Sequence, residues 1–464
     1  MKRKLTLKYV SLFTMVLCAA FMMASCRKFI EVPPPINSIV TSQVFADSAD
    51  ATAAINGIYI NMINRAGSLN IANSGVSVFG SLSADETYYS LNVASYNEFY
   101  INAITVTNAN NASLWAKAYT YIYQANACIE GVANSTTLST TLKNRITGEA
   151  KFLRSFMYFY LVNLYGRVPL ALTTDYKVTD ILPRAAVADI YTQINADLTA
   201  AQALLGNDPV PINKVRVNRF SVAAFFARVQ LYQQQWAAAE ASATSVINAA
   251  YKLEPNLNNV FLNGNQEQIW QMTPIAAGDE TTEGQLYIPS SATTVPQFVV
   301  TSSLLNTFEA NDQRQALWLN TSTVAGTKYV YPYKYKLGFD NSTTPKEAYS
   351  MLRLGEQYLI RAEARAQQNN LAGAIADINA IRSRAGLPNA TAINQTAVLA
   401  AVQHERQTEL FCEWGQRWLD LKRTNTIDAV LSVGKTGWQP AAALFPVPYT
   451  QIQLNPFLTQ NPGY

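Results

Sequence analysis

The apolar positions of this chain recur at helical spacing, and they fall into pairs of segments separated by short polar turns. One pair covers residues 220–232 and 236–247, and another covers 352–366 and 371–381. Gly386 follows the second pair and provides a helix cap. A single helix pair cannot bury its own apolar face, so we expect several pairs to stack on one another and share a core.

Two further pairs follow from the same pattern. Residues 149–165 pair with 190–205, and residues 113–132 pair with 138–146. The match of such pairs to the tetratricopeptide consensus is loose, but the helix–turn–helix repetition is the same. The predicted fold class is therefore mostly α, a tetratricopeptide-like scaffold of helix pairs.

Two segments interrupt this helical pattern, at about 66–112 and 263–345. Both are rich in Ser, Thr, Asn, Gly and Tyr. Short alternating runs at 268–272 and 328–336 predict a few small strands or hairpins. Long irregular insertions on a rigid scaffold are where binding residues usually lie, so these two segments are the candidate ligand-binding regions.

Aromatic side chains gather in the first insertion, over a stretch in which we find no helical period. Tyrosine rings in polar segments have less reason to be core than rings on the helix pairs, and nearby asparagines can bond hydroxyl groups. The candidate ligand-binding residues are Tyr88, Tyr89, Tyr96, Phe99, Tyr100, Asn70, Asn73 and Asn92, with Tyr287 in the second insertion. Two alternatives stay open: these rings simply hold a large loop in place, or the site lies nearer to Tyr287 and Phe298.

The N-terminus has the pattern of an export signal. Four basic residues precede an apolar run at 9–23, and Ala24 and Ser25 then precede Cys26. A Cys directly after small residues resembles the lipobox of bacterial lipoproteins, although an ordinary signal peptide with an incidental Cys gives a similar pattern. We predict a signal peptide at 1–25, lipidation of Cys26, a proline-stiffened tether at 26–36 and a single domain at 37–464.

Charge and composition narrow the choice of ligand. The formal net charge of +4 is carried by Lys2, Arg3, Lys4 and Lys8, so the processed chain is close to neutral and has no basic field for nucleic acid. Charged residues make up only 14% of the chain, whereas it contains 25 Tyr and 19 Phe. Aromatic faces and uncharged polar groups suit neutral, hydroxyl-rich ligands.

Catalytic patterns are missing from the sequence. His404 is the single histidine, which excludes His-based triads and multi-His metal sites. Glu405, Glu409 and Glu413 lie four residues apart, on one face of a predicted helix, and a carboxylate pair can hydrolyse a glycosidic bond. We favour structural ion pairs instead, because arginines lie close by, namely Arg406, Arg417 and Arg423.

We therefore predict no enzyme activity, no catalytic residue, no metal and no cofactor. His404 is expected at the surface. Cys128 and Cys412 remain after processing; two buried free thiols are favoured over a disulfide between them.

The C-terminal segment is unusual, because it is apolar and yet contains four prolines, at 446, 448, 456 and 462. Prolines at this density rule out a helix or an interior strand, so we expect an extended segment that lies in a groove of its own domain. The segment ends in Gln-Asn-Pro-Gly-Tyr. Together with blocks at 149–170, 312–336, 353–387 and 405–423, this ending closely resembles the SusD-like (RagB/SusD) outer-membrane lipoproteins. Trp414, between Glu413 and Gly415, departs from the usual family pattern.

The resemblance implies a function as well as a fold. It implies a right-handed stack of helix pairs that is lipid-anchored to the outer membrane and faces the cell exterior. It also implies that the protein captures an oligosaccharide and delivers it to a SusC-type TonB-dependent transporter. Three alternatives remain: a peptide-binding member of the same fold, a cell-surface glycoside hydrolase, and a helical-repeat scaffold for protein partners. The long aromatic insertions speak against the last of these.

Overall fold

The computed structural model describes residues 44–64, 69–206, 214–276, 278–338 and 344–464. The expected signal peptide, Cys26 and the tether lie outside these residues and stay predictions. Phe45–Tyr464 forms one compact unit. In the described ranges, no helix has the length and apolarity needed to cross a membrane.

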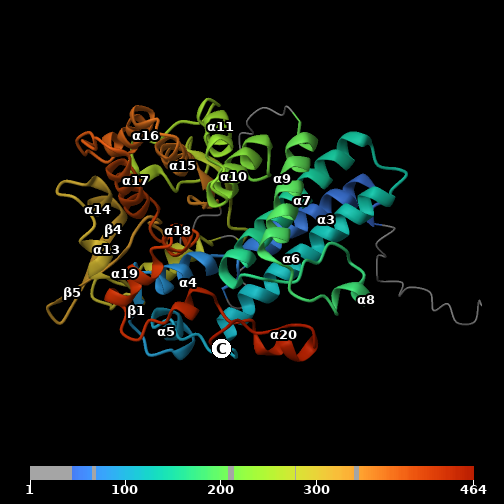
Figure 1. The fold of residues 1–464 in the computed structure, drawn as a ribbon, viewed down its shortest axis with the longest axis horizontal. Coiled ribbons are helices and arrows are strands. Elements are labelled where there is room, and N and C mark those ends of the chain that lie inside the picture. Colours follow the sequence, from blue (N-terminus) through green and yellow to red (C-terminus); the bar gives the residue numbers. More distant parts are fainter. Residues whose placement is uncertain (1–43, 65–68, 207–213, 277, 339–343) are drawn as a thin grey trace, which may run out of the picture. The chain divides into compact units, whose positions relative to one another are not determined.

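The structure is mostly helical, which confirms the predicted fold class. Figure 1 shows α6, α7 and α9 packed together, and α10, α11, α15, α16 and α17 gathered in a second group. The long helices are α3 (Ser48–Ile63), α6 (Ala109–Asn134), α7 (Thr140–Tyr165), α9 (Val187–Leu204), α10 (Arg219–Tyr232), α11 (Trp236–Ile247), α15 (Leu354–Gln367), α16 (Leu371–Arg384) and α17 (Gln395–Leu410).

The pairs α10–α11 and α15–α16 form where the apolar spacing predicts them. Ala227 of α10 packs against Ala239 and Ala243 of α11 and against Ile360 and Ala364 of α15, and all five side chains are fully buried. Small side chains allow these helices to approach closely. Neighbouring pairs therefore share one core, as the stacking argument requires.

The prediction for residues 138–165 is wrong in one respect. Residues 140–165 form one continuous helix, α7, and not two helices of different pairs. Gly148 lies inside it where α9 ends, and a Cβ at this position would come within 2.8 Å of the side chain of Leu205. The polar residues before Gly148 lie on partly exposed turns, which explains why the apolar pattern is interrupted there. The predicted packing of 149–165 against the 190–205 helix is confirmed.

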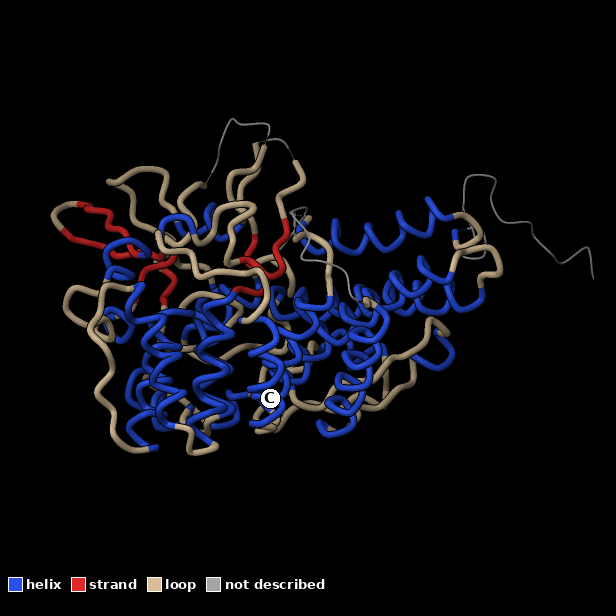
Figure 2. Tube along the Cα trace, turned by 90° about the horizontal axis from the view of Figure 1, so that it is seen from above, coloured by secondary structure: helices blue, strands red, loops and turns tan. Residues whose placement is uncertain are grey.

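The strands are few and short, as expected. They form antiparallel two-stranded pairs, which Figure 2 shows in red. The pairs are β1 (Thr87–Tyr89) with β3 (Phe298–Val300), β2 (Gln268–Met272) with β6 (Tyr349–Arg353), and β4 (Leu319–Val324) with β5 (Thr327–Pro332).

The first insertion is less irregular than predicted, because it contains α4 (Gly75–Ser83) and α5 (Ala94–Tyr100). All residues of α4 are buried. A Cβ on Gly80 would come within 2.5 Å of the Cα of Gly415, so glycine lets α4 lie directly against the 412–415 turn. The Ser and Gly residues that suggest a loop in the sequence are close-packing residues of a buried helix.

The remaining helical elements are short. The second insertion contains α12 (Thr282–Tyr287), α13 (Ser302–Leu305) and α14 (Gln313–Trp318). Elsewhere the chain forms α8 (Tyr176–Thr179), α18 (Gln416–Arg423), α19 (Ile427–Gly434) and α20 (Tyr449–Leu454), with single 3₁₀ turns at Leu257–Asn259 and Pro440–Ala443.

The C-terminal segment packs on its own domain, but the exclusion of a helix from it is wrong. Helix α20 fits between two prolines, and Pro448 stands at its N-cap, where the missing backbone N–H costs no helical hydrogen bond. Phe445 and Val447 are buried, and the backbone N–H of Phe445 donates to the carbonyl of Leu164 over 2.8 Å.

Cys128 and Cys412 are both buried and free, which confirms the favoured interpretation. Burial raises the pKa of the Cys128 thiol to about 12 and that of Cys412 well above its ordinary value. Both thiols are thus kept protonated and poorly reactive.

Candidate ligand-binding surface

Strand pairing joins the two insertions at the candidate site. Tyr89 of β1 lies opposite Phe298 of β3, with ring centroids 5.0 Å apart. The pairing is extended at one end by Ser90, whose N–H donates to Gln297 over 2.8 Å, and at the other by Thr301, whose N–H donates to Glu86 over 3.0 Å. The two locations left open by the sequence, around Tyr89 and around Phe298, are therefore one location.

Helix α5 adds two more rings to this surface. Tyr96 stacks on Tyr89 with centroids 4.5 Å apart and planes 14° from parallel, and Tyr100 lies 6.1 Å from Tyr88. Phe99, on the opposite face of α5, is fully buried against Phe79 at 4.3 Å. Phe99 thus anchors α5, while Tyr96 and Tyr100 lie on its partly exposed side.

We call Tyr88, Tyr89, Tyr96 and Tyr100 the aromatic patch. All four side chains are half-buried, and their hydroxyl groups form no hydrogen bond to any described residue. Partial burial raises the pKa values of Tyr88, Tyr89 and Tyr96, so these hydroxyls stay protonated at neutral pH. The patch combines fixed aromatic rings with free hydroxyl groups, as binding of a polyhydroxylated ligand requires.

The other buried candidates cannot touch a ligand in this arrangement, so we correct their expected role from contact to support. Asn70 and Asn73 are each only 2% exposed. The carbonyl oxygen of the Asn70 side chain accepts from the N–H of Ala72 and of Asn73, which fixes the turn before α4. Tyr287 is 4% exposed and packs edge-on against Phe298 at 5.5 Å. Asn92 is exposed in the loop before α5.

Two neighbours of the patch are not evident from sequence. Lys435 lies with its ammonium 5.2 Å from the ring of Tyr100, and it donates to the carbonyls of Leu82 and Ser83. Burial lowers its pKa to about 7. Tyr329 of β5 contributes to the raised pKa of Tyr88. No local pattern connects Lys435 or Tyr329 to the first insertion, because both are distant in sequence.

The predicted row of three glutamates forms ion pairs, but with other partners than expected. Glu405 and Glu409 lie on α17, whereas Glu413 follows the end of that helix. Arg406, Arg417 and Arg423 pair instead with Asp420, Asp85 and Glu363. The three glutamates are bound by Arg314, Arg353, Arg382, Arg384 and Lys334.

These contacts speak against a catalytic role for Glu409. Burial alone would raise the pKa of this carboxyl, but Arg384, Arg353 and Arg314 together lower it well below its ordinary value. A general acid must hold a proton at working pH, and Glu409 does not.

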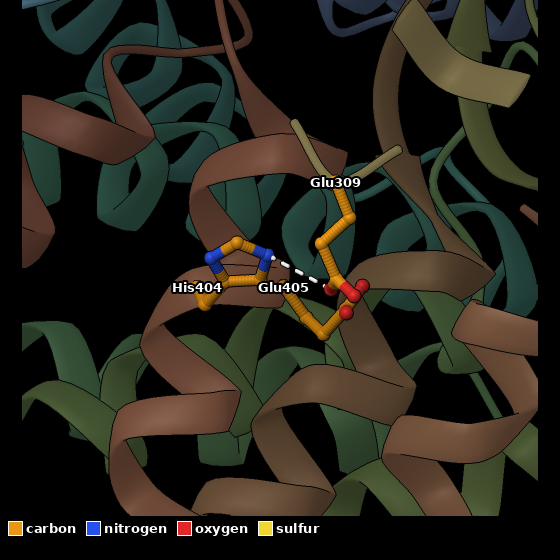
Figure 3. Close-up of side chains that lie close together, drawn as sticks. All are labelled: Glu309, His404 and Glu405. Atoms are coloured by element: carbon orange, nitrogen blue, oxygen red, sulfur yellow. Dashed lines mark ion pairs between the residues drawn. The ribbon is translucent and has the colours of Figure 1, made fainter. Parts of the chain in front are cut away.

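His404 is only partly exposed, and Figure 3 shows it beside Glu309, with its Nε2 atom 3.3 Å from Oε1 of that residue. Among the described residues, His404, Glu309 and Glu405 are the one group of His, Cys or acidic side chains close enough to share a metal ion. Arg382 already supplies positive charge between two of these carboxylates, because its Nη1 atom donates to Glu309 over 2.5 Å and to Glu405 over 2.7 Å. We assign no metal to this group.

Comparison with known protein families gives two matches along the chain. Residues 28–231 match a family model described as starch-binding and associating with the outer membrane, and residues 281–464 match the model of the SusD family. The chain is a SusD-like protein: it belongs to the SusD family.

Individual relatives are distant but extend over most of the chain. A SusD-like protein of Formosa agariphila, P25, is 24% identical, and the alignment covers 95% of this chain and 97% of that protein. The starch-binding protein SusD of Bacteroides thetaiotaomicron is also 24% identical, over 72% of this chain and 74% of its own.

Solved structures show the same fold. A laminarin-binding SusD-like protein superposes with a TM-score of 0.76 at 24% identity, covering 90% of this chain and 99% of its own. A SusD-like carbohydrate-binding protein of Bacteroides fragilis gives a TM-score of 0.79 at 19% identity, with 90% and 100% covered.

Proposed function

We propose that this protein is a cell-surface lipoprotein that captures an oligosaccharide on the aromatic patch and delivers it to a TonB-dependent transporter of the SusC type. The observation that carries the proposal is the stacked pair Tyr89–Tyr96, held in a fixed orientation by Phe298. Anchoring through Cys26 and exposure to the cell exterior belong to the same proposal.

The geometry of the patch supports a glycan ligand. Rings that are already packed against one another lose little conformational freedom when a ligand binds. The four free tyrosine hydroxyls, together with exposed Asn92, offer donors and acceptors to sugar hydroxyl groups. The names of the starch-binding and laminarin-binding relatives support the same class of ligand.

The alternatives are weaker on specific grounds. A peptide-binding site usually adds hydrogen bonds from an exposed strand edge or a charged group for a terminus. Lys435, the charged group beside the patch, is buried and bound to two carbonyls, so it is not available to the terminus of a peptide. A hydrolase needs a protonated acid beside the glycosidic bond, and the row of glutamates is held by arginines. We therefore propose a binding protein without enzyme activity.

Calorimetry on the processed protein tests the proposal, with starch, laminarin and other neutral glucans as ligands and a tryptic peptide mixture as the competing class. Removing both stacked rings, in Tyr89→Ala/Tyr96→Ala, should cost about 2 kcal/mol, or roughly 30-fold in Kd. The matched control is Tyr176→Ala/Tyr449→Ala, which removes two exposed tyrosines of α8 and α20 and should leave glycan affinity unchanged. Equal affinity of the wild type and the patch variant, or binding of peptides alone, would contradict the proposal.

A further inference from the structure

A groove lies between α6, the segment at 169–180 and the C-terminal segment that contains α20. Figure 1 labels α6, α8 and α20 in one region of the molecule. The volume of the groove is about 380 Å³, which is within the range of small-ligand sites in proteins. The four tyrosines of the aromatic patch do not line it, so the groove is a separate candidate site.

Three aromatic side chains line the groove from one side of α6. They are Trp115, Tyr119 and Tyr123, which lie four residues apart and therefore follow one another along the helix. Trp115 is only 2% exposed and lies 5.2 Å from Tyr119, centroid to centroid. Tyr123 is 56% exposed and has no ring contact with another described residue. Trp115 and Tyr119 thus belong to the wall, and Tyr123 presents a free ring face to a ligand.

Four hydrogen-bonding side chains that line the groove are free. Those of Tyr123, Thr179, Asp180 and Gln451 form no hydrogen bond or ion pair with any described residue, and all four are at least partly exposed. Together they provide hydroxyl, amide and carboxylate groups, which can both donate and accept. Asp180 is the one charged residue among the described residues that line the groove, and its two oxygens can accept from two neighbouring hydroxyl groups of a ligand.

The remaining polar side chains of the groove fix its walls. The hydroxyl of Tyr119 donates to the carbonyl of Pro169 over 2.8 Å, and the amide of Asn126 donates to the carbonyl of Ala171 over 3.1 Å. The amide of Asn455, directly after α20, donates to the carbonyl of Leu182 over 2.9 Å. These bonds hold α6, the 169–180 segment and the C-terminal segment together, so a ligand meets a groove that is already shaped.

This combination favours a neutral saccharide over a cation or a peptide. A ring face packs on the C–H face of a sugar, while free hydroxyl, amide and carboxylate groups bond to its hydroxyls. A cation site needs several exposed ring faces, and of the three rings only that of Tyr123 is more than half exposed. Extended peptides usually pair with the edge of a strand, and no residue of β1–β6 lines the groove.

Buried rings connect the groove to the helix that carries half of the aromatic patch. Trp115 lies 4.9 Å from Tyr165, and Tyr165 lies 6.1 Å from Phe445. Phe445 in turn lies 5.3 Å from Phe99, which anchors α5. All four rings are buried, so the groove and the patch are held at a fixed separation within one compact unit. Two sites on one rigid body bind a chain that reaches both more tightly than either site binds alone.

We infer that this groove is a second saccharide-binding site, which takes a short stretch of the same neutral glycan as the aromatic patch. Tyr123 stacks on the sugar, and Asp180, Thr179 and Gln451 bond to its hydroxyls. A long chain occupies the groove and the patch together. The inference rests on the proposed function for the class of ligand.

Calorimetry on Tyr89→Ala/Tyr96→Ala measures the groove alone, because the patch is disabled in this variant. The probes are maltotriose, laminaritriose, mannotriose and xylotriose, with choline as a cation. At least one trisaccharide should bind with a Kd in the millimolar range, and adding Tyr123→Ala/Asp180→Asn should weaken it by about tenfold or more. The matched control, Tyr176→Ala/Asp189→Asn, changes exposed residues that do not line the groove and should leave the affinity unchanged.

Three results would overturn the inference: no trisaccharide binding in the patch variant, binding of choline alone, or equal affinity with and without the groove substitutions. The first of these would leave the proposed function intact. Trisaccharide binding that is unchanged in the patch variant and lost in Tyr123→Ala/Asp180→Asn would contradict only the proposed site at the patch.

A long glycan tests joint occupation of the two sites. In an otherwise wild-type protein, Tyr123→Ala/Asp180→Asn should leave the affinity of the patch for the trisaccharide unchanged. The same variant should bind the corresponding polysaccharide roughly tenfold more weakly than wild type, because the chain loses its second contact. Equal polysaccharide affinity of the two proteins would show that one chain does not occupy both sites.

Discussion

Arg353 and Glu409 form a buried ion pair, in which Nη1 of Arg353 donates to Oε1 of Glu409 over 2.6 Å. The same guanidinium reaches Glu267 and Glu413, and Glu409 also pairs with Arg384. This network connects β6, α16, α17 and the residues just before β2. It joins α16 and α17 of the second helix group to the β2–β6 strand pair, so its loss should affect folding and not chemistry.

We expect Glu409→Gln to lower the free energy of unfolding by about 3–5 kcal/mol, because the buried arginines lose their counter-charge. The control is Glu240→Gln, which breaks a partly exposed pair with Arg365 and should change stability by roughly 0–1 kcal/mol. Urea unfolding of both variants measures the difference. Polysaccharide cleavage by the wild type that disappears in Glu409→Gln would show instead that this carboxylate is catalytic.

Two glycines should respond in opposite directions to the same substitution. Gly57 lies within α3 with open space around its missing side chain, so Gly57→Ala should stabilise the protein by about 0.5–1 kcal/mol. Gly80→Ala should destabilise it by roughly 1–3 kcal/mol, because the new methyl group would press on the backbone of Gly415. Thermal unfolding of the two variants checks the signs. A stabilising Gly80→Ala would mean that α4 does not lie as close to the 412–415 turn as described.

The helix pairs could be predicted because their information is local. The spacing of Val222, Phe225 and Val229 is enough to orient one face of α10 toward a core, and the polar turn after Tyr232 ends the helix. The same reasoning fails within α7, because an exposed polar turn and a break between helices look alike in sequence. Only the packing of Gly148 against Leu205 separates them.

The candidate site could be predicted only in part, because local composition indicates the segment but not which of its side chains are exposed. Composition pointed to Tyr89 and Tyr96, which do stack, but it could not separate them from Tyr287, which is buried. The pairing of β1 with β3 joins segments that are far apart in the chain, and no local pattern contains that information. Polar side chains such as Asn70 also look like ligand contacts in sequence when their actual role is to fix a turn.

The C-terminal segment should depend on Asn461. Its amide donates to the carbonyls of Tyr165 over 2.9 Å and Phe445 over 2.8 Å, and its oxygen accepts from Arg184. Asn461 is 3% exposed, so Asn461→Ala leaves buried groups without partners and should cost about 1–3 kcal/mol. Limited proteolysis should then release the C-terminal residues faster than in the wild type. Gln453→Ala, on the exposed side of α20, is the control and should not change the rate. Equal rates in all three proteins would mean that Asn461 does not hold the segment in place.

Stability should depend on pH through Glu86, which lies directly before β1. Its side chain is 1% exposed; Oε2 accepts from the N–H of Cys412 over 3.2 Å, and Oε1 has no partner. Burial and the charge of Asp85 raise the pKa of Glu86 to about 8. The Cys412 N–H, Arg417 and Lys334 lower this pKa, but their effects are weaker. An unfolded glutamate titrates near about 4.3, so between that pH and 8 the folded state binds more protons than the unfolded state. The stability that Glu86 contributes is therefore fully present at acid pH and is lost as pH rises to 8.

Glu86→Gln cannot lose a proton, so its free energy of unfolding should rise relative to wild type by up to about 1.4 kcal/mol per pH unit over this window. Urea unfolding at pH 5, 6, 7 and 8 measures this difference. Both proteins contain the buried lysines Lys422 and Lys435, so the opposing pH-dependent contributions of these lysines to stability cancel in the difference. A flat difference for Glu86→Gln would show that Glu86 is ionised in the folded protein at neutral pH.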